Sequence, residues 1–245
     1  METPRKRDGD RMDHSTPDST KTTSLAGSIH DRLRTDILTG RLEPGLKLQM
    51  KLLTERYDAG QTPLREALNR LSSEGLVESR VQRGFYVKPV HLDELRELTK
   101  TRCWLEALAL RESIAHATPD WDEELIIAHH RLTRTPRSLD PERFEDNPEW
   151  ERLHRDFHKV LISRCGSTPL LEFCEQLADR LYRYRMLSIR KVFTTRHVKD
   201  EHAEILQLVL DRDSERATEA LTHHYKRTAD AVLKDLGTPD PREDG

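Results

Sequence analysis

The most restrictive feature of this sequence is residues 62–89, TPLREALNRLSSEGLVESRVQRGFYVKP, where a helical pattern changes abruptly into a strand pattern. Apolar residues recur at helical spacing from Leu64 to Leu71, and Gly75 then ends the helix. The alternating residues that follow predict two short strands joined by a turn at 82–84. Few small folds place a hairpin directly after a helix of this kind.

The segments before this stretch complete a recognisable plan. Thr62 is suited to capping the helix, with Pro63 at its first position. Two further helices are predicted, at 24–40, where the first residue is a serine suited to capping, and at 46–57. A short helix, a tight turn and a second helix form a helix-turn-helix, and the hairpin would be its wing. We therefore expect a winged helix-turn-helix domain over residues 24–90.

From His91 onward the pattern is helical. We expect an all-helical domain over residues 91–236, of ordinary domain size. The predicted fold class is mainly α: an N-terminal winged helix-turn-helix and a C-terminal bundle of six or seven helices. Residues 1–23 are predicted to be a disordered polar arm, and 237–245 a tail. The predicted helices of the bundle are 91–117, 119–134, 148–165, 168–191, 195–211 and 213–236.

Composition narrows the setting in which the protein works. Its three cysteines include no CxxC pair, which favours a reducing compartment. No apolar run approaches the roughly 18 residues of a membrane span, and the N-terminus lacks the apolar core of a signal peptide. We expect a cytoplasmic protein with no membrane partner. Residues 24–89 carry eleven Lys/Arg and eight Asp/Glu, a net charge of 11 − 8 = +3, although the whole chain carries −3.

The outer face of the helix that follows residue 60 carries side chains suited to reading DNA. Arginine can pair with guanine through two hydrogen bonds, and glutamine or asparagine with adenine. Basic residues at the head of the preceding helix and in the wing turn could contact phosphates, and a glycine there would let the backbone approach a groove. The predicted DNA-binding residues are Lys51, Gln61, Thr62, Arg65, Asn69, Arg70, Arg83 and Gly84. The alternative is that these are solvated charges, since winged helices also mediate protein contacts.

Four histidines fall on inward faces of three predicted helices: His154 and His158 one turn apart, then His202 and His224. A single inward histidine is usually a hydrogen-bonded core residue, which remains the alternative for each of them. Four facing one interior would leave several ring nitrogens to satisfy if neutral, and would repel one another if protonated. A divalent metal resolves both problems, and imidazole suits Zn, Ni or Cu.

Arg102 falls in the centre of the apolar face of helix 91–117, and an inward arginine needs an anion. Glu106, one turn on, could supply it as a structural ion pair. The other interpretation is that Arg102 binds the carboxylate of a ligand. Tyr184 and the flanking Arg185 could line the same cavity, although core packing explains Tyr184 equally well.

The segments "DILTGRLEPGLKL" and "LLTERYDAGQTPLREALNRLSSEGLVESRVQRGFYV" resemble the winged-helix domain of GntR-family bacterial transcription regulators. The segment "LDELRELTKTRCWLEALALR" is similar to the start of the all-helical effector domain, called FCD, of the FadR-type branch. The resemblance covers about residues 24–236. It implies a dimeric, ligand-responsive repressor or activator of a catabolic operon that binds pseudo-palindromic operator DNA.

The resemblance also assigns roles to residues. Arg65 matches the base-contacting arginine of the family, whereas Gln61 stands where the family usually has arginine and Lys51 where it often has arginine. The operator sequence therefore cannot be borrowed from relatives. In the helical domain the resemblance implies that His158, His202 and His224 are metal ligands.

His154 stands where the family commonly has aspartate. A nitrogen-rich ligand set of this kind favours Zn or Ni over Mn or Mg.

The resulting functional prediction is a DNA-binding regulator, not an enzyme, whose helical domain senses a small organic acid at a metal. A metallohydrolase is the first alternative, but HRDFH lacks the glutamate that H-E-x-x-H supplies as a general base. A di-iron or haem bundle is the second. Such a site uses two Glu-x-x-His motifs. The sequence has one, ERLH at 151–154, and lacks the second copy.

Overall fold

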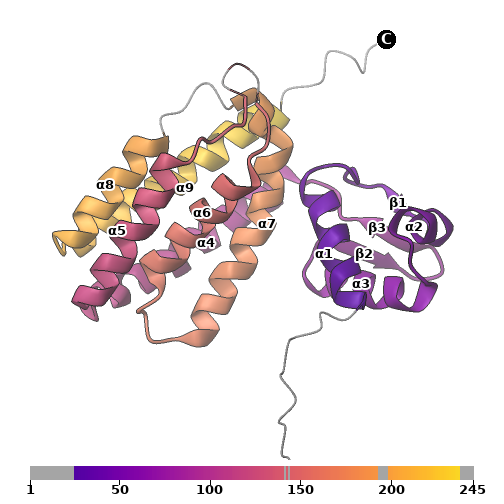
Figure 1. Ribbon diagram of the computed structural model, residues 1–245, viewed down its shortest axis with the longest axis horizontal. Coiled ribbons are helices and arrows are strands. Elements are labelled where there is room, and N and C mark those ends of the chain that lie inside the picture. The colour runs from indigo at the N-terminus through magenta and orange to yellow at the C-terminus, as the bar shows by residue number, and fades with distance from the viewer. Residues whose placement is uncertain (1–24, 141, 143, 193–197, 238–245) are drawn as a thin grey trace, which may run out of the picture.

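The chain forms two domains in a computed structural model that describes residues 25–140, 142, 144–192 and 198–237 (Figure 1). The N-terminal domain consists of α1 (Leu25–Leu38), β1 (Lys47–Leu48), α2 (Met50–Tyr57), α3 (Gln61–Ser73), β2 (Val77–Arg80) and β3 (Gly84–Val87). The second domain consists of α4 (Leu92–Ala115), α5 (Pro119–Arg134), α6 (Pro148–Ile162), α7 (Thr168–Val192), α8 (Val198–Leu210) and α9 (Ser214–Leu236). The predicted winged helix-turn-helix followed by an all-helical bundle is confirmed.

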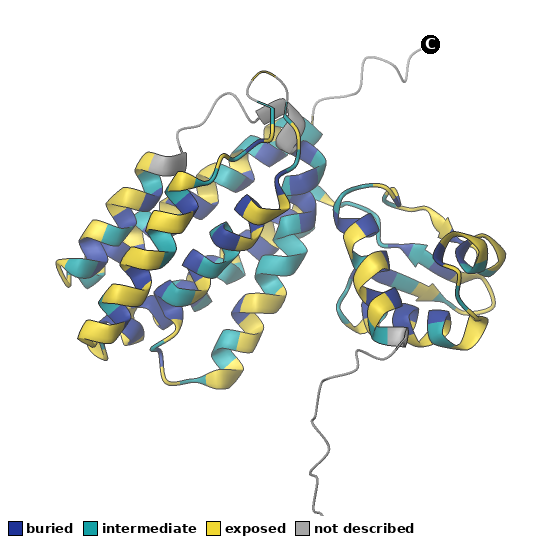
Figure 2. Ribbon diagram, viewed as in Figure 1, coloured by how far each residue is buried: buried dark blue, intermediate teal, exposed yellow. Residues whose placement is uncertain are grey.

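The N-terminal domain packs three helices against a small antiparallel sheet with strand order β1-β3-β2. Its buried core takes Ile29 and Leu33 from α1, Leu64 and Leu68 from α3, and Val87 from β3. Apolar residues at i, i+4 positions put one face of α1 against one face of α3, and the exposed residues lie on the outer faces (Figure 2).

Two predicted boundaries in this domain were wrong. The helix expected at 46–57 begins at Met50, because Lys47 and Leu48 pair with β3 and extend the sheet. The recognition helix begins at Gln61 with Gly60 as N-cap, not Thr62. The amide of Leu64 donates to the carbonyl of Gly60 at 3.3 Å, which closes the first turn one residue earlier. Ser24, the predicted cap of α1, lies outside the described residues, as do the arm and most of the tail.

The helical domain is organised around α4, which packs against α9, α7 and α6. Its largest buried cluster includes Trp121 of α5, Phe157 and Leu161 of α6, and Leu221 of α9. Asn147 caps α6 by accepting hydrogen bonds from the amides of Glu149 and Trp150. This cap fixes where α6 begins. Among the described residues, no helix is both long and apolar enough to cross a membrane.

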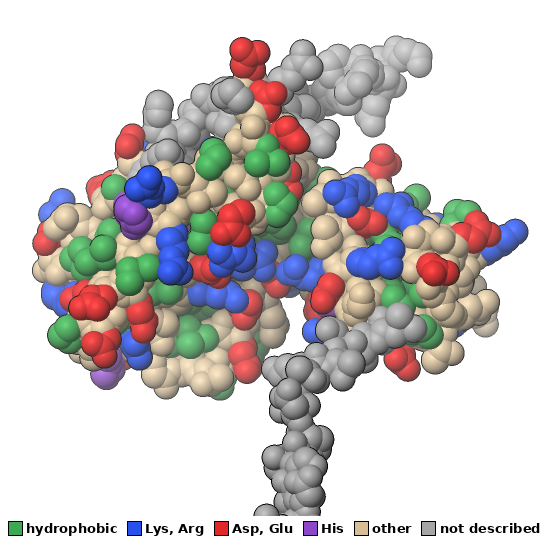
Figure 3. Space-filling view, in the orientation of Figure 1, with side chains coloured by type: hydrophobic (Ala, Val, Ile, Leu, Met, Phe, Trp, Pro, Cys, Tyr) green, Lys and Arg blue, Asp and Glu red, His purple; other side chains and the backbone are tan. Residues whose placement is uncertain are grey.

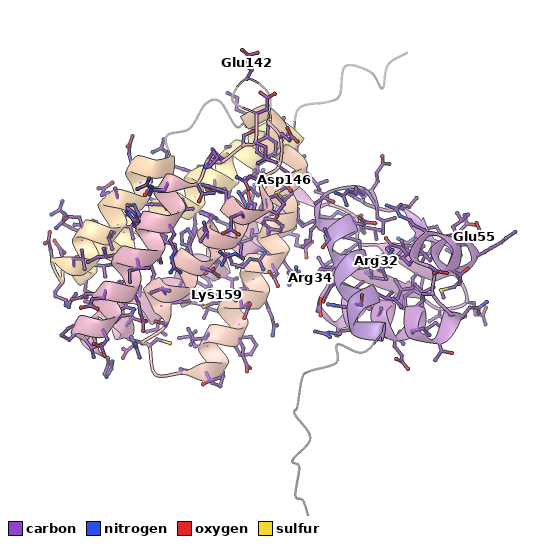
Figure 4. All side chains as sticks on the ribbon, in the orientation of Figure 1. Arg32, Arg34, Glu55, Glu142, Asp146 and Lys159 are labelled. Atoms are coloured by element: carbon purple, nitrogen blue, oxygen red, sulfur yellow. The ribbon has the colours of Figure 1, made fainter. Side chains whose placement is uncertain are left out.

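The two domains meet where α1 lies beside α7 (Figure 1). Arg34 of α1 donates to Asp179 of α7 at 2.7 Å, and Figure 4 shows Arg34 on the side of α1 that faces the helical domain. Tyr182, one turn further along α7, packs against the buried core of the N-terminal domain. Helix α7 therefore provides one contact between the two domains.

Glu94, near the start of α4, forms a second contact at this junction. It accepts hydrogen bonds from Lys88, which follows β3, at 2.6 Å and from the Tyr184 hydroxyl at 2.7 Å, as well as from Arg180. Arg183 also donates to the carbonyl of Lys88. These bonds fasten the end of the wing strand to the helical bundle.

Candidate metal and effector site

The four histidines predicted to face one interior are brought together by α6, α8 and α9. His154 and His158 come from α6, His202 from α8 and His224 from α9, and their nearest ring nitrogens all lie within 4.8 Å of one another. His158, His202 and His224 are buried, and His154 is partly buried. The helical register turns each histidine toward the interior, and the packing of the three helices brings the four together.

Neighbouring groups fix the orientation of two of these rings. The Tyr225 hydroxyl donates to the carboxylate of Glu106, and its oxygen lies 3.0 Å from Nδ1 of His158. Since the hydroxyl proton goes to Glu106, Nδ1 of His158 carries the proton and donates to Tyr225. Nε2 of His158 then presents a lone pair to the cluster, 3.2 Å from Nε2 of His154.

His224 is held in the same way by a carboxylate. Its Nδ1 lies 2.7 Å from Oε2 of Glu201, whose other oxygen accepts from Arg227 at 3.1 Å. Hydrogen bonding at Nδ1 leaves Nε2 of His224 as the nitrogen available to the cluster. Metal-binding histidines in proteins usually have a partner of this kind on the second ring nitrogen, because it fixes the tautomer and raises ligand basicity.

The electrostatics of the cluster favour neutral rings. Burial lowers the pKa of His154 and of His158 well below the usual range, and the neighbouring histidines lower both further. A neutral imidazole has a free lone pair and is the form that binds a metal. Ligand nitrogens of a tetrahedral Zn²⁺ ion stand roughly 3.4 Å apart. The four nitrogens therefore fit a divalent ion after a small contraction of the cluster.

Each of the three residues predicted to contact the effector is hydrogen-bonded to a carboxylate of this chain. Arg102 donates to Glu106 at 2.6 Å, and its guanidinium lies 3.9 Å from the centroid of the Tyr225 ring. Arg185 donates to the buried Glu151. The Tyr184 hydroxyl is engaged by Glu94 at the domain junction. The structural pair of Arg102 with Glu106 is thus formed, and a ligand would have to bind beside it.

A cavity of about 360 Å³ adjoins the cluster and is lined by residues of α4, α6, α7 and α9. Three of the four histidines line it, together with all three predicted effector contacts. Helices α6 and α7 run antiparallel along it, since Glu151 pairs with Arg185 and Lys159 with Glu175. The cavity has the size of an ordinary small-molecule site.

Sequence reasoning missed three residues of this site. Tyr225 and Glu201 orient histidine rings, and Trp150 stacks on His154 with ring centroids 4.7 Å apart. Glu201 directly precedes His202 and Tyr225 directly follows His224. This adjacency was the only sign in the sequence that they belong to the site. No sequence signal could have found Trp150, because its stacking on His154 depends on the side-chain rotamers. Asp156 pairs with Arg152 and is not part of the cluster.

All predicted DNA-binding residues are exposed on the N-terminal domain. Lys51 lies in the first turn of α2, and Arg83 and Gly84 lie at the wing turn. The predicted residues of α3 are on its exposed side, opposite the buried Leu64 and Leu68. Gly84 has φ +89°, a left-handed backbone that favours glycine. Arg70 also pairs with Glu74 at 3.2 Å. Figure 3 shows Lys and Arg side chains spread over the visible face of this domain, with acidic side chains among them.

A winged helix-turn-helix whose recognition helix is exposed, joined to a helical domain that encloses a small-molecule cavity, defines a bacterial DNA-binding transcription regulator. The chain belongs to the GntR family: residues 25–87 match the model of bacterial regulatory proteins, gntR family, and residues 97–227 match the FCD domain. The resemblance seen in the sequence is confirmed, and the chain is a transcription regulator, not an enzyme.

Individual relatives agree with this assignment. The HTH-type transcriptional regulator BphR of Paraburkholderia xenovorans is 37% identical over 214 residues, which cover 85% of each chain. The HTH-type transcriptional repressor GlaR of Escherichia coli is 34% identical over 82% of this chain and 92% of its own. Among solved structures, E. coli McbR/YncC superposes with a TM-score of 0.68 at 22% identity, covering 87% of this chain and 99% of that one. The last comparison supports the fold alone.

Proposed function

We propose that this regulator is a repressor of a catabolic operon that senses a small organic acid at a metal in its helical domain. The observation that carries the proposal is the cluster of four histidine nitrogens within 4.8 Å, beside a cavity lined by Arg102. When bound, a Zn²⁺ or Ni²⁺ ion would supply an uncompensated positive charge, since all four ligands are neutral. Arg102 would offer a second positive group to the same carboxylate.

The DNA-binding half of the proposal rests on the exposed face of α3. Gln61, Arg65 and Asn69 would contact base edges, while Lys51 and Arg83 would contact phosphates. We infer a homodimer on a pseudo-palindromic operator, in which effector binding favours one arrangement of the two recognition helices over another. A repressor role is supported by the relative GlaR, which is named a transcriptional repressor.

An exposed apolar patch on α4 supports the homodimer. Trp104 and Leu108, one turn apart, are 63% and 48% exposed. Large apolar side chains that adjoin on a helix surface are commonly covered by a partner. Trp104→Glu is expected to convert the dimer to a monomer in analytical ultracentrifugation, whereas Phe173→Glu, a substitution at an exposed aromatic on α7, is the matched control. A monomeric wild-type chain would contradict the dimer.

The decisive experiment measures binding of the full chain to its own promoter region across a salt series, with and without Zn²⁺ and candidate acids. We expect affinity to fall steeply with salt because phosphate contacts release counterions. Arg65→Ala should lower affinity for the operator by about tenfold or more. A flat response to salt, or an affinity for the operator that no combination of metal and acid alters, would overturn the proposal.

A further inference from the structure

The cavity beside the histidines has two chemically different ends. One end is polar and contains His224, Arg102 and Glu106. The other is lined by Leu95 of α4 and Val232 of α9, which belong to one buried apolar cluster. Arg102 lies seven positions after Leu95 on α4, which is roughly 10 Å along a helix. A ligand held at the polar end therefore has about this length of cavity beyond it.

The apolar end offers no unpaired charge to a ligand, because Arg185, one turn from Leu181 on α7, is paired with Glu151. Leu181 and Ala231 line it beside Leu95 and Val232, and the polar residues near them among the described lining are Thr99 and Thr228. The hydroxyl of Tyr184, which also lines the cavity, is engaged by Glu94. An anionic group placed there would lose its hydration without gaining a cation.

The other charged side chains of the cavity are matched with opposite charges. Lys159 lies 2.5 Å from Glu175, and Arg155 pairs with Asp179. Arg185 pairs with Glu151, and Arg102 with Glu106 at 2.6 Å. The guanidinium of Arg137, also in the lining, lies 5.5 Å from the ring centroid of Trp150, which stacks on His154. Because these ion pairs cancel, a metal bound by the histidines would supply the uncompensated positive charge, at the histidine end.

We propose that the effector is a monocarboxylic acid with an uncharged apolar body. Its carboxylate would lie at the histidine end beside Arg102, and its body over Leu95, Leu181 and Val232. This inference rests on the proposed sensing of a carboxylate and adds the class of acid. It excludes dicarboxylates long enough to put their second charge at the apolar end.

The test is calorimetric titration of the zinc-loaded, full-length protein with acids of increasing length. Acetate, butanoate and hexanoate would be compared with adipate, which has the length of hexanoate and a second carboxylate. Burial of each methylene is expected to tighten binding by about threefold to fourfold. Adipate is expected to bind at least tenfold more weakly than hexanoate.

Two variants locate the apolar body. Leu181→Asn should weaken hexanoate at least tenfold and leave acetate unchanged, because only the longer acid reaches this residue. The matched control is Leu171→Asn on the same helix, which lines the cavity at its other end beside Cys174 and Glu175. Ala231→Phe, which fills the apolar end, provides the same readout if Leu181→Asn does not fold.

The outcomes separate this inference from the function on which it rests. If no acid binds the zinc-loaded protein, carboxylate sensing itself is wrong, and this inference falls with it. If adipate or acetate binds as tightly as hexanoate, sensing stands and the apolar body is refuted. If Leu171→Asn and not Leu181→Asn weakens hexanoate, the proposed placement of the body is refuted.

Discussion

At the scale of single residues, the site depends on which nitrogen each imidazole presents. Tyr225 is hydrogen-bonded to Nδ1 of His158, and Glu201 to Nδ1 of His224. These bonds fix the tautomer of each ring, so that Nε2 points into the cluster. His154 is different: it is partly exposed and is held by stacking on Trp150. The histidines are therefore not equivalent as ligands, although the sequence predicts an inward position for all four.

This difference predicts an order of metal affinities. His158→Ala should weaken zinc binding at least tenfold more than His154→Ala, because His158 is buried and preoriented by Tyr225. The measurement is a competition titration with a chromophoric chelator. His223→Ala, at the exposed neighbour of His224, should leave the affinity unchanged. Equal losses for His154 and His158 would show that preorientation contributes little.

Removal of one hydroxyl tests the orienting role of Tyr225 directly. Tyr225→Phe leaves the ring in place but removes the acceptor of the His158 Nδ1 proton. We expect zinc affinity to fall by about 10- to 100-fold, as for other groups that orient ligands. Tyr86→Phe in the wing strand is the control for loss of a tyrosine hydroxyl. Unchanged affinity in Tyr225→Phe would argue against the role.

At the scale of elements, the recognition helix has the right exposure but an unusual first residue. Gln61 opens α3 at the position where the resemblance to the family leads us to expect arginine, and glutamine pairs with adenine better than with guanine. The wing turn and the head of α2 keep their basic residues. We therefore expect affinity for the DNA backbone to be retained and base preference to change.

Gln61→Arg should shift that preference toward guanine at one operator position by about tenfold. The measurement is selection from an operator library randomised in each half-site. The salt dependence of binding should rise only slightly, because a base contact and not a phosphate contact is exchanged. A variant that selects the same sequence as the wild type would place Gln61 outside the base-reading set.

The junction of α4 with α7 and the wing should respond to acid through Glu94. Burial alone would raise the pKa of Glu94, but hydrogen bonds from Lys88, Tyr184 and Arg180 outweigh it and hold the pKa at about 2. Because the folded-state pKa lies below the ordinary value, the stabilising contribution is present above about pH 4.5 and is lost as pH falls toward 2.

Glu94→Gln should therefore lower the melting temperature at pH 7 and have a much smaller effect near pH 3. The contribution at neutral pH is on the order of 2 kcal/mol. Melting of the metal-free protein by circular dichroism would measure it at each pH. Glu97→Gln, at an exposed position on the same helix, is the control. A deficit that stays constant from pH 7 to pH 3 would contradict the assigned cause.

At the scale of the whole molecule, one carboxylate connects the cavity to the DNA-binding domain. Asp179 accepts from Arg34 of α1 at 2.7 Å and from Arg155, the neighbour of His154 on α6. Both Arg155 and Asp179 line the cavity. Tyr182 lines it too, and packs against the core of the N-terminal domain. Any ligand that moves α6 relative to α7 therefore acts on the contact with α1.

Asp179→Asn should reduce the change in DNA affinity that the effector causes, because it weakens the contact with both arginines. The measurement is operator affinity by fluorescence anisotropy, with and without effector. Glu175→Gln, one turn away, removes a pair with Lys159 that does not reach the N-terminal domain, and should leave the response intact. An undiminished response in Asp179→Asn would assign the coupling to other contacts.

The sequence by itself determined the order of elements and the faces of the helices. His154 and His158 could be assigned to the inward face of α6, and Arg65 and Asn69 to the outward face of α3. These assignments were possible because side-chain direction in a helix follows from a repeat of 3.6 residues. The long motif around Arg65 also made the family visible. These properties are local, and local spacing is what a sequence records.

Only the tertiary structure decided how faces from distant segments meet. The pairing of β1 with β3, the hydrogen bond from His158 to Tyr225 and the contact of Arg34 with Asp179 join residues that lie far apart in the chain. Arg102 shows the limit most clearly: its inward position was evident, but whether Glu106 met it depended on rotamers and packing. Such contacts depend on the relative placement of whole helices, which no spacing within one helix specifies.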